Sequence, residues 1–293
     1  MRALLTGGAG NIGRVALSRL LQAGHDVTVL DAVPLPEGLG AASIVADLTQ
    51  PAALDGLPEP PEAIVHLAAI PNPFVATWDR VLAINMLTTF NVLRYAAEKG
   101  VPRVVFGSSE SASGWGIHGR FYRPDYIPIA EKHRDLPSEV YSYTKAFGDQ
   151  LCAGFSREYG LTTLALRYTY VVYEPHYAGF LGGVRADAPR DARGATYAWI
   201  DVRDVAEAIA LALVADVPTG SHEAFYLTAR DQCGTVSTAE LARRNWGDDP
   251  PVPLDQTYYG DEPSRSFFDI RKAGSMLGWK PAWDLGRLLR ERP

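Results

Sequence analysis

Short apolar runs alternate with longer amphipathic segments along the first half of the chain, and this pattern predicts strands separated by helices. Apolar side chains recur at three- and four-residue steps through residues 76–99, which predicts a helix ending at Gly100, and another helix is expected from about 138 to 159. The strands are almost continuously apolar, which is typical of a parallel sheet covered by helices on both faces. The strands predicted on this basis are residues 1–5, 25–31, 42–46, 63–67, 101–106 and 161–167.

A glycine turn joins the first strand to a helical segment, because residues 6–13 read Thr-Gly-Gly-Ala-Gly-Asn-Ile-Gly. The glycines at 7, 10 and 13 allow a tight bend, a close backbone approach to a pyrophosphate, and close packing of helix on strand. Amides at the helix N-terminus then face the phosphates. The second strand ends at Asp31, about 20 residues after the turn, where a carboxylate would bind the ribose diol of adenosine and repel a 2′-phosphate. These features predict a Rossmann-type, doubly wound α/β fold that binds NAD in preference to NADP.

The pattern changes after residue 167. Residues 168–198 mix aromatic residues, glycines and prolines without a clear period, and order returns at 199–204, before a helix predicted at 205–215. We expect the irregular stretches to form a lid over the carboxyl edge of the sheet, where doubly wound folds bind ligands. The remaining predicted elements are a strand at 223–228 and helices at 237–245 and 284–291.

This organisation predicts two domains. Residues 1–167, completed by about 199–215, are expected to form the NAD-binding domain. Residues 168–198 and 216–293 are expected to form a small lobe that binds the substrate.

Composition excludes several classes of partner. The 293 residues carry a net charge of −6 with no block of like charges, so neither nucleic acid nor an acidic membrane surface is an expected partner. Cys152 and Cys233 cannot form a disulfide framework. No signal peptide precedes the first strand and no apolar run reaches about 18 residues, so the cytoplasm is the expected location. His118, His133 and His176 have no carboxylate or cysteine at ligand spacing, and no metal site is predicted.

The pair Tyr141 and Lys145 carries the candidate chemistry. A spacing of four places both side chains on one face of the predicted helix, so an ammonium can lie near a phenol and lower its pKa. Such a phenol can exchange a proton with a substrate hydroxyl while a hydride moves to or from nicotinamide. Ser109 ends a strand 32 residues before Tyr141, and its hydroxyl could hold the same substrate oxygen.

These motifs together resemble the NAD-dependent epimerase/dehydratase group of extended short-chain dehydrogenases/reductases. The resemblance implies that Tyr141 is the general acid/base, that Lys145 binds the nicotinamide ribose and lowers the tyrosine pKa, and that Ser109 orients the reacting oxygen. The further matching segments are Asp47-Leu48 as an adenine contact, His66 to Ala69 beside the cofactor, Asn85 with Thr89, Leu166-Arg167-Tyr168, residues 200–206, and Leu277 to Pro281. The cofactor contacts that the resemblance implies are Gly7, Gly10, Asn11, Ile12, Gly13, Asp31, Asp47, Leu48, Leu67, Ala68, Ala69, Asn85, Tyr141, Lys145 and Tyr168.

Departures from the family pattern bear on the substrate. Dehydratases of this group carry Thr-Asp-Glu where this chain has Ser109-Glu110-Ser111, which disfavours dehydration. Only 33 residues, 168–200, separate Arg167 from Asp201, which leaves little chain to wrap a UDP-sized substrate. The turn at 173–175 is similar to that of uronate dehydrogenases, although the Asn-His pair and loop serine of those enzymes are absent here. Glu110, Ser111 and Tyr170 are the candidate substrate contacts, and the substrate stays open.

Two further groups of side chains could face the substrate or serve only the fold. The loops that should face the pocket hold Trp115, Phe121, Tyr122, Tyr126, Tyr170, Tyr173 and Tyr177. The cations available for an acidic substrate are Arg120, Arg123, Arg185 and Arg265.

The sequence therefore predicts an NAD-dependent enzyme that transfers hydride from a hydroxyl of a small carbohydrate-like substrate, a sugar or sugar acid, to NAD. The alternative is a sugar or nucleotide-sugar epimerase that uses the same residues. A non-catalytic NAD(H) sensor is least favoured, because such a protein has no need of both Tyr141 and Lys145. The resemblance also implies a homodimer formed through helices 76–99 and 138–159.

Overall fold

Seven parallel strands form the central sheet in the order β3-β2-β1-β4-β5-β6-β9. The computed structural model describes residues 1–115, 122–185 and 196–292, and the side chain of Arg185 is outside the description. The strands are β1 (Arg2–Thr6), β2 (Asp26–Asp31), β3 (Ala42–Val45), β4 (Ala63–His66), β5 (Arg103–Gly107), β6 (Thr162–Tyr168) and β9 (His222–Leu227). The parallel order confirms the predicted Rossmann-type α/β fold.

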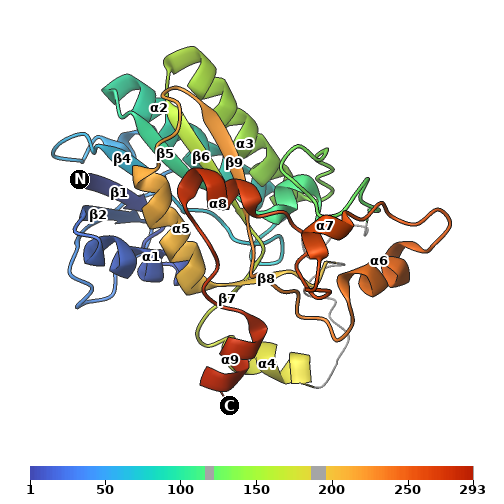
Figure 1. The fold of residues 1–293 in the computed structure, drawn as a ribbon. Coiled ribbons are helices and arrows are strands. Elements are labelled where there is room, and N and C mark those ends of the chain that lie inside the picture. Colours follow the sequence, from blue (N-terminus) through green and yellow to red (C-terminus); the bar gives the residue numbers. More distant parts are fainter. Residues whose placement is uncertain (116–121, 186–195, 293) are drawn as a thin grey trace.

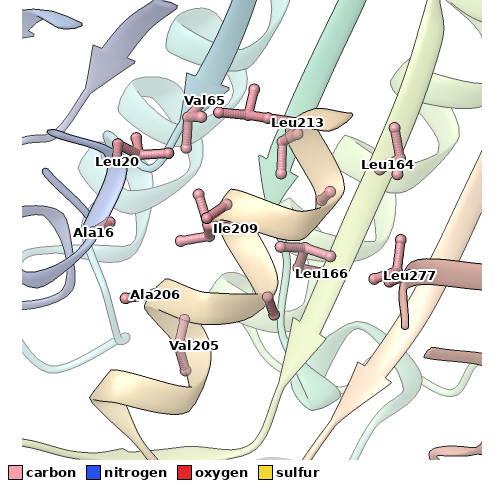
Figure 2. Packing of buried hydrophobic residues seen from close by; sticks show 14 of the residues in the cluster. Ala16, Leu20, Val65, Leu164, Leu166, Val205, Ala206, Ile209, Leu213 and Leu277 are labelled. Atoms are coloured by element: carbon pink, nitrogen blue, oxygen red, sulfur yellow. The ribbon is translucent and has the colours of Figure 1, made fainter. Parts of the chain in front are cut away.

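Successive strand residues enter two separate cores, which explains why the strands are apolar on both faces. Leu4 packs in one core and Leu5 in the other, and Val104 and Val105 divide in the same way. Helices α1 (Asn11–Gln22) and α5 (Val202–Val214) cover one face. Figure 2 shows Val205, Ile209 and Leu213 of α5 directed toward the sheet.

The other face is covered by α2 (Trp78–Lys99) and α3 (Val140–Tyr159), which lie side by side (Figure 1). Each ends at a glycine in the left-handed region, Gly100 (φ 68°) and Gly160 (φ 69°), as the sequence pattern predicts for Gly100. A capping box between Glu139 and Ser142 fixes the start of α3. The start of this helix matters because Tyr141 lies in its first turn.

The smaller part of the molecule lies beyond the carboxyl ends of the strands and contains the C-terminus (Figure 1). It has a two-stranded parallel sheet of β7 (Tyr170–Val172) and β8 (Trp199–Asp201). Its helices are α4 (Tyr177–Arg185), α6 (Thr238–Trp246), α7 (Gln256–Tyr259) and α9 (Leu285–Glu291). Two short 3₁₀ helices, Pro51–Leu54 and Glu110–Ser113, follow strands of the central sheet.

Three predictions need correction. The stretch 168–198 is not irregular where it is described, because β7 and α4 lie within it. Helix α5 begins at Val202, because the carboxylate of Asp201 caps it by accepting a hydrogen bond from the Arg203 amide. The segment 216–293 does not belong wholly to the small lobe.

Strand β9 pairs with β6 in the central sheet, and α8 (Arg271–Leu277) packs on β9 and α5. Leu277 and Trp279 are buried in the same core as α5, and Figure 2 shows Leu277 directed toward it. The C-terminal segment therefore contributes to the central sheet and its core as well as to the smaller part of the molecule. No helix in the described parts of the chain is long and apolar enough to cross a membrane.

Candidate active site

A cavity of about 1090 Å³ lies along the carboxyl edge of the central sheet. Its wall is built from the segments that follow or end the parallel strands: the turn after β1, the end of β2, the loops after β3, β4 and β5, and the end of β6. The predicted site residues on this wall are Gly7, Gly10, Asn11, Ile12, Gly13, Asp31, Asp47, Leu48, Leu67, Ala68, Ala69, Ser109, Glu110, Ser111, Tyr141, Lys145, Tyr168 and Tyr170. Ligand sites at this edge are the rule for doubly wound sheets.

The glycine turn has no room for a side chain at Gly7 or Gly13. Gly7 has a φ of 73°, and a Cβ added there would lie 2.6 Å from the amide nitrogen of Ala68. A Cβ on Gly13 would lie 2.1 Å from the carbonyl oxygen of Gly7. No side chain caps the N-terminus of α1 at Gly10, so the amides that start this helix line the pocket with their positive end free to face a pyrophosphate. The turn therefore fits a dinucleotide.

Acidic side chains lie where the adenosine half of a dinucleotide is expected. Asp31 ends β2, and its carboxylate accepts hydrogen bonds from the amides of Ala9 (2.9 Å) and Val33 (3.2 Å). The bond from Ala9 ties the carboxylate to the glycine turn, and the bond from Val33 is local to the end of β2. Asp47 and Leu48 line the same end of the cavity, and Asn91 of α2 donates to the Leu48 carbonyl oxygen at 2.9 Å.

Asn85 does not line the cavity in the described structure, although the resemblance implies a cofactor contact there. Its amide group accepts a hydrogen bond from the Ile70 amide (2.7 Å) and donates to the Ile70 carbonyl oxygen and the Thr144 hydroxyl (both 3.1 Å). Asn85 therefore holds the loop after β4 in place without lining the cavity itself. Its contact with the cofactor stays a prediction.

His66 serves the fold. Its ring contacts the hydroxyls of Thr6 (2.8 Å) and Thr89 (3.2 Å), and burial lowers its pKa to about 3, which keeps the ring neutral. Thr6 also accepts a hydrogen bond from the Ala68 amide. The histidine thus links β1, β4 and α2 beneath the pocket wall.

Ser109, Tyr141 and Lys145 share the opposite end of the cavity. The Ser109 hydroxyl hydrogen-bonds to the Tyr141 phenol and accepts a bond from the Ser111 amide at 3.1 Å. The Lys145 ammonium donates to the Gly107 carbonyl oxygen at 2.6 Å and lies 5.6 Å from the centre of the Tyr141 ring. The three side chains come from the end of β5 and the first turns of α3.

The expected lowering of the Tyr141 pKa is wrong for this structure. Burial raises the pKa of the phenol, and the nearby Tyr168 raises it further. Burial also lowers the pKa of Lys145 to about 8. The physical reason is that desolvation penalises both charged forms, while the ammonium is bonded to a backbone carbonyl group and lies against the ring.

Glu110 and Thr169 are buried on the same wall. The exposed fractions of these residues are 5% and 3%. The Tyr170 amide donates to the Glu110 carboxyl group, and burial raises the pKa of this group well above its ordinary value. Thr169, with Arg80 and His176, is a wall residue that the sequence did not single out as a site contact.

Most of the other candidate side chains serve the fold. Arg123 donates to the carbonyl oxygens of Trp246 and Pro250, and Arg265 contacts the Tyr258 carbonyl oxygen. Of the candidate aromatic residues, Tyr170 and Tyr173 line the cavity, while Trp115, Tyr122 and Tyr177 pack in apolar clusters. His118, Arg120 and Phe121 lie outside the described residues, as does the side chain of Arg185.

Comparisons with known proteins agree with this geometry. The model of the NAD dependent epimerase/dehydratase family matches residues 3–225. The UDP-glucose 4-epimerase of Corynebacterium glutamicum is 28% identical over 313 residues, which cover 96% of this chain and 91% of that protein. A uronate dehydrogenase of Pseudomonas putida is 30% identical over 168 residues, which cover 57% of this chain and 59% of that protein.

The fold is also similar to solved structures. The crystal structure of a short-chain dehydrogenase/reductase superfamily protein from Agrobacterium tumefaciens with bound NAD aligns with a TM-score of 0.72 at 23% identity, covering 99% of this chain and 95% of that one. The family model covers most of the chain and includes the glycine turn, Ser109, Tyr141 and Lys145. The chain therefore belongs to the NAD dependent epimerase/dehydratase family, as an NAD-dependent enzyme of the extended short-chain dehydrogenase/reductase type.

Proposed function

We propose that this enzyme transfers a hydride to NAD from the carbon that carries a hydroxyl group in a small sugar or sugar acid. The observation that carries the proposal is that Ser109, Tyr141 and Lys145 line the same cavity as the glycine turn. A dinucleotide bound along this wall would bring its nicotinamide end toward Tyr141, which is half-buried.

In the oxidative direction, the Ser109 hydroxyl holds the substrate oxygen and Tyr141 takes its proton. NAD, when bound, accepts the hydride from the carbon atom that bears this oxygen. Because burial raises the pKa of the phenol, Tyr141 needs a nearby positive charge to act as a base. Lys145 supplies that charge, and its ammonium lies 5.6 Å from the centre of the tyrosine ring.

The small lobe is proposed to bind the substrate. The part of the wall that the lobe contributes includes Tyr170 and Val171 of β7, and Tyr173 and His176 of the turn before α4. Tyrosine rings suit a sugar, because each offers an apolar face and a polar hydroxyl group.

The alternative is epimerisation, in which hydride leaves and then returns to the other face of a keto intermediate. One observation favours it, since a relative matched over 96% of this chain is a UDP-glucose 4-epimerase. Net production of NADH separates the two reactions. A dehydrogenase accumulates NADH from added NAD, whereas an epimerase returns each hydride and leaves NADH absorbance unchanged.

The test is NADH absorbance with free aldoses, uronic acids and nucleotide sugars. Tyr141→Phe is expected to lower kcat by about 10²- to 10⁴-fold while NAD still binds, because the substitution removes only the proton acceptor. Tyr143→Phe is the matched control, because Tyr143 lies on the same helix, is 40% exposed and does not line the cavity. Full activity of Tyr141→Phe on every substrate of the wild type would contradict the proposed chemistry.

We also propose a homodimer formed through α2 and α3. Large apolar side chains are exposed along these two adjacent helices: Leu82, Leu87, Phe90, Tyr143 and Phe147. Exposed apolar side chains on two adjacent helices favour association of two copies. Light scattering should give twice the chain mass of 31.9 kDa, and Phe90→Glu should shift it toward the monomer.

A further inference from the structure

Two buried polar atoms on the cavity wall have no hydrogen-bond partner in the described structure. They are the second carboxyl oxygen of Glu110, Oε2, and the hydroxyl oxygen of Thr169. The other unpartnered buried atoms of the described residues belong to side chains that do not line the cavity. Glu110 and Thr169 are therefore the unpartnered buried residues that lie at the candidate site.

Glu110 and Thr169 are held close to the reacting groups by the backbone. Glu110 directly follows Ser109, and its carboxyl group accepts a hydrogen bond from the Tyr170 amide. Thr169 directly precedes Tyr170, and its own amide donates to the Leu227 carbonyl oxygen at 3.1 Å. These contacts fix the two side chains at the junction of β5, β6 and the lobe.

Leaving a buried polar group without a partner costs about 1–3 kcal/mol, and most such groups in proteins are paired. Because both residues line the cavity, a bound ligand that completes their hydrogen bonds is the best explanation of the two unpartnered atoms. A carboxyl group that stays protonated offers one O–H donor as well as an acceptor, and a threonine hydroxyl can do both. The complementary group on a sugar is a hydroxyl, which also donates and accepts.

We propose that Glu110 and Thr169 form a subsite for the sugar hydroxyl on the carbon next to the reacting one. The proposal rests on the proposed function, which assigns the reacting oxygen to Ser109 and Tyr141. It adds that Glu110 binds as a neutral acid. It also makes the neighbouring hydroxyl a requirement for substrates, since a deoxy sugar would leave both side chains unpaired.

The subsite can be tested by binding, without turnover. The wild-type protein saturated with NADH forms a dead-end complex with an aldose, because both partners are already reduced. Calorimetry would compare D-galactose, D-glucose and L-arabinose, each against its 2-deoxy counterpart. We expect at least one of these aldoses to bind roughly 10- to 100-fold more tightly than its deoxy form, as follows from the cost of an unpaired buried group.

Four variants distinguish loss of the subsite from loss of the folded structure. Glu110→Ala and Thr169→Val should bring this ratio close to one by weakening binding of the parent sugar. Glu110→Gln and Thr169→Ser keep neutral hydrogen-bonding groups and should preserve it. NADH affinity, measured in all four, reports whether the cofactor site is intact.

Equal affinity for each aldose and its deoxy form, or no binding of any, would overturn the subsite. Loss of the ratio in Glu110→Gln with NADH binding intact would also overturn it, because a neutral acid would then not be the binding form. Failure of the proposed function looks different. In that case the aldoses bind with the expected preference, but NADH does not accumulate when they are supplied with NAD.

Discussion

At one end of the cavity the wall is made of backbone, and at the other it is made of buried side chains. The glycine turn presents amides and Cα atoms, with an added Cβ on Gly13 only 2.1 Å from a carbonyl oxygen. The far end presents Ser109, Glu110, Tyr141 and Lys145, three of which have pKa values shifted by burial. Recognition at the first end depends on shape and at the second on charge and hydrogen bonding. The two ends should therefore fail in different ways when they are altered.

The largest expected effect is at the glycine turn. Gly13→Ala forces a methyl group onto the Gly7 carbonyl, a backbone atom that cannot move without opening the turn. We expect NAD affinity, measured by quenching of tryptophan fluorescence, to fall at least about 100-fold, which corresponds to about 3 kcal/mol.

Gly154→Ala is the matched control for this substitution. Gly154 lies within α3, has no positive φ, and an added Cβ would meet nothing within 4 Å. Alanine is the better helix former, so this variant should be as stable as the wild type or more so, with unchanged NAD affinity. An NAD affinity of Gly13→Ala within about threefold of the wild type would show that the turn does not depend on shape as argued.

The second-largest effect is expected at the end of the cavity that holds Ser109, Tyr141 and Lys145. Lys145 titrates at about 8 in the folded protein, against an ordinary value of 10.5, because burial disfavours the ammonium. Between these two pH values the unfolded chain binds a proton that the folded chain does not, so folding stability rises with pH. Relative to Lys145→Met, the free energy of unfolding of the wild type should increase by about 3 kcal/mol from pH 7.5 to 10.5.

Urea denaturation at several pH values measures this difference, and titrations that the two proteins share cancel from it. Lys145→Met should also lose NADH production below about pH 8, where the wild-type ammonium is charged, because Tyr141 loses its neighbouring positive charge. A difference in stability that does not change with pH would mean that Lys145 keeps an ordinary pKa in the folded protein.

The end of the site formed by the glycine turn was largely predictable from sequence. The end formed by the side chains of Ser109, Glu110, Tyr141 and Lys145 was only partly predictable. All seven strands of the central sheet were predicted as strands, because each contains several apolar residues within a short span, but the strand at 223–228 was assigned to the small lobe and not to this sheet. The glycine spacing and Asp31 are local signals that need no tertiary contact. In contrast, the short β7 has too few residues to show a period, and α4 contains Gly179, Gly182 and Gly183, which disguise a helix.

The electrostatics of the site could not be predicted, because they depend on contacts between distant segments. The raised pKa of Glu110 follows from burial on a wall that β7 completes, and the lowered pKa of Lys145 from burial in the sheet edge. The cations Arg123 and Arg265 looked available in the sequence. In the structure each guanidinium group donates to a backbone carbonyl oxygen instead. Arg123 bonds to Pro250, which is far along the chain, and Arg265 bonds to Tyr258.

The smallest expected effect returns to the end of the cavity that holds the glycine turn, at the carboxylate that ends β2. Asp31 accepts hydrogen bonds from the Ala9 and Val33 amides, so it both shapes the turn and presents negative charge to the cavity. Asp31→Ser removes the charge that would repel a 2′-phosphate and keeps an acceptor for one amide. We expect the ratio of kcat/KM for NADP to that for NAD to rise about 10- to 100-fold, mainly through KM, with kcat on NAD nearly unchanged. A fall in kcat without a change in this ratio would mean that Asp31 supports the turn but takes no part in selecting the cofactor, and shape alone would then govern this end of the site.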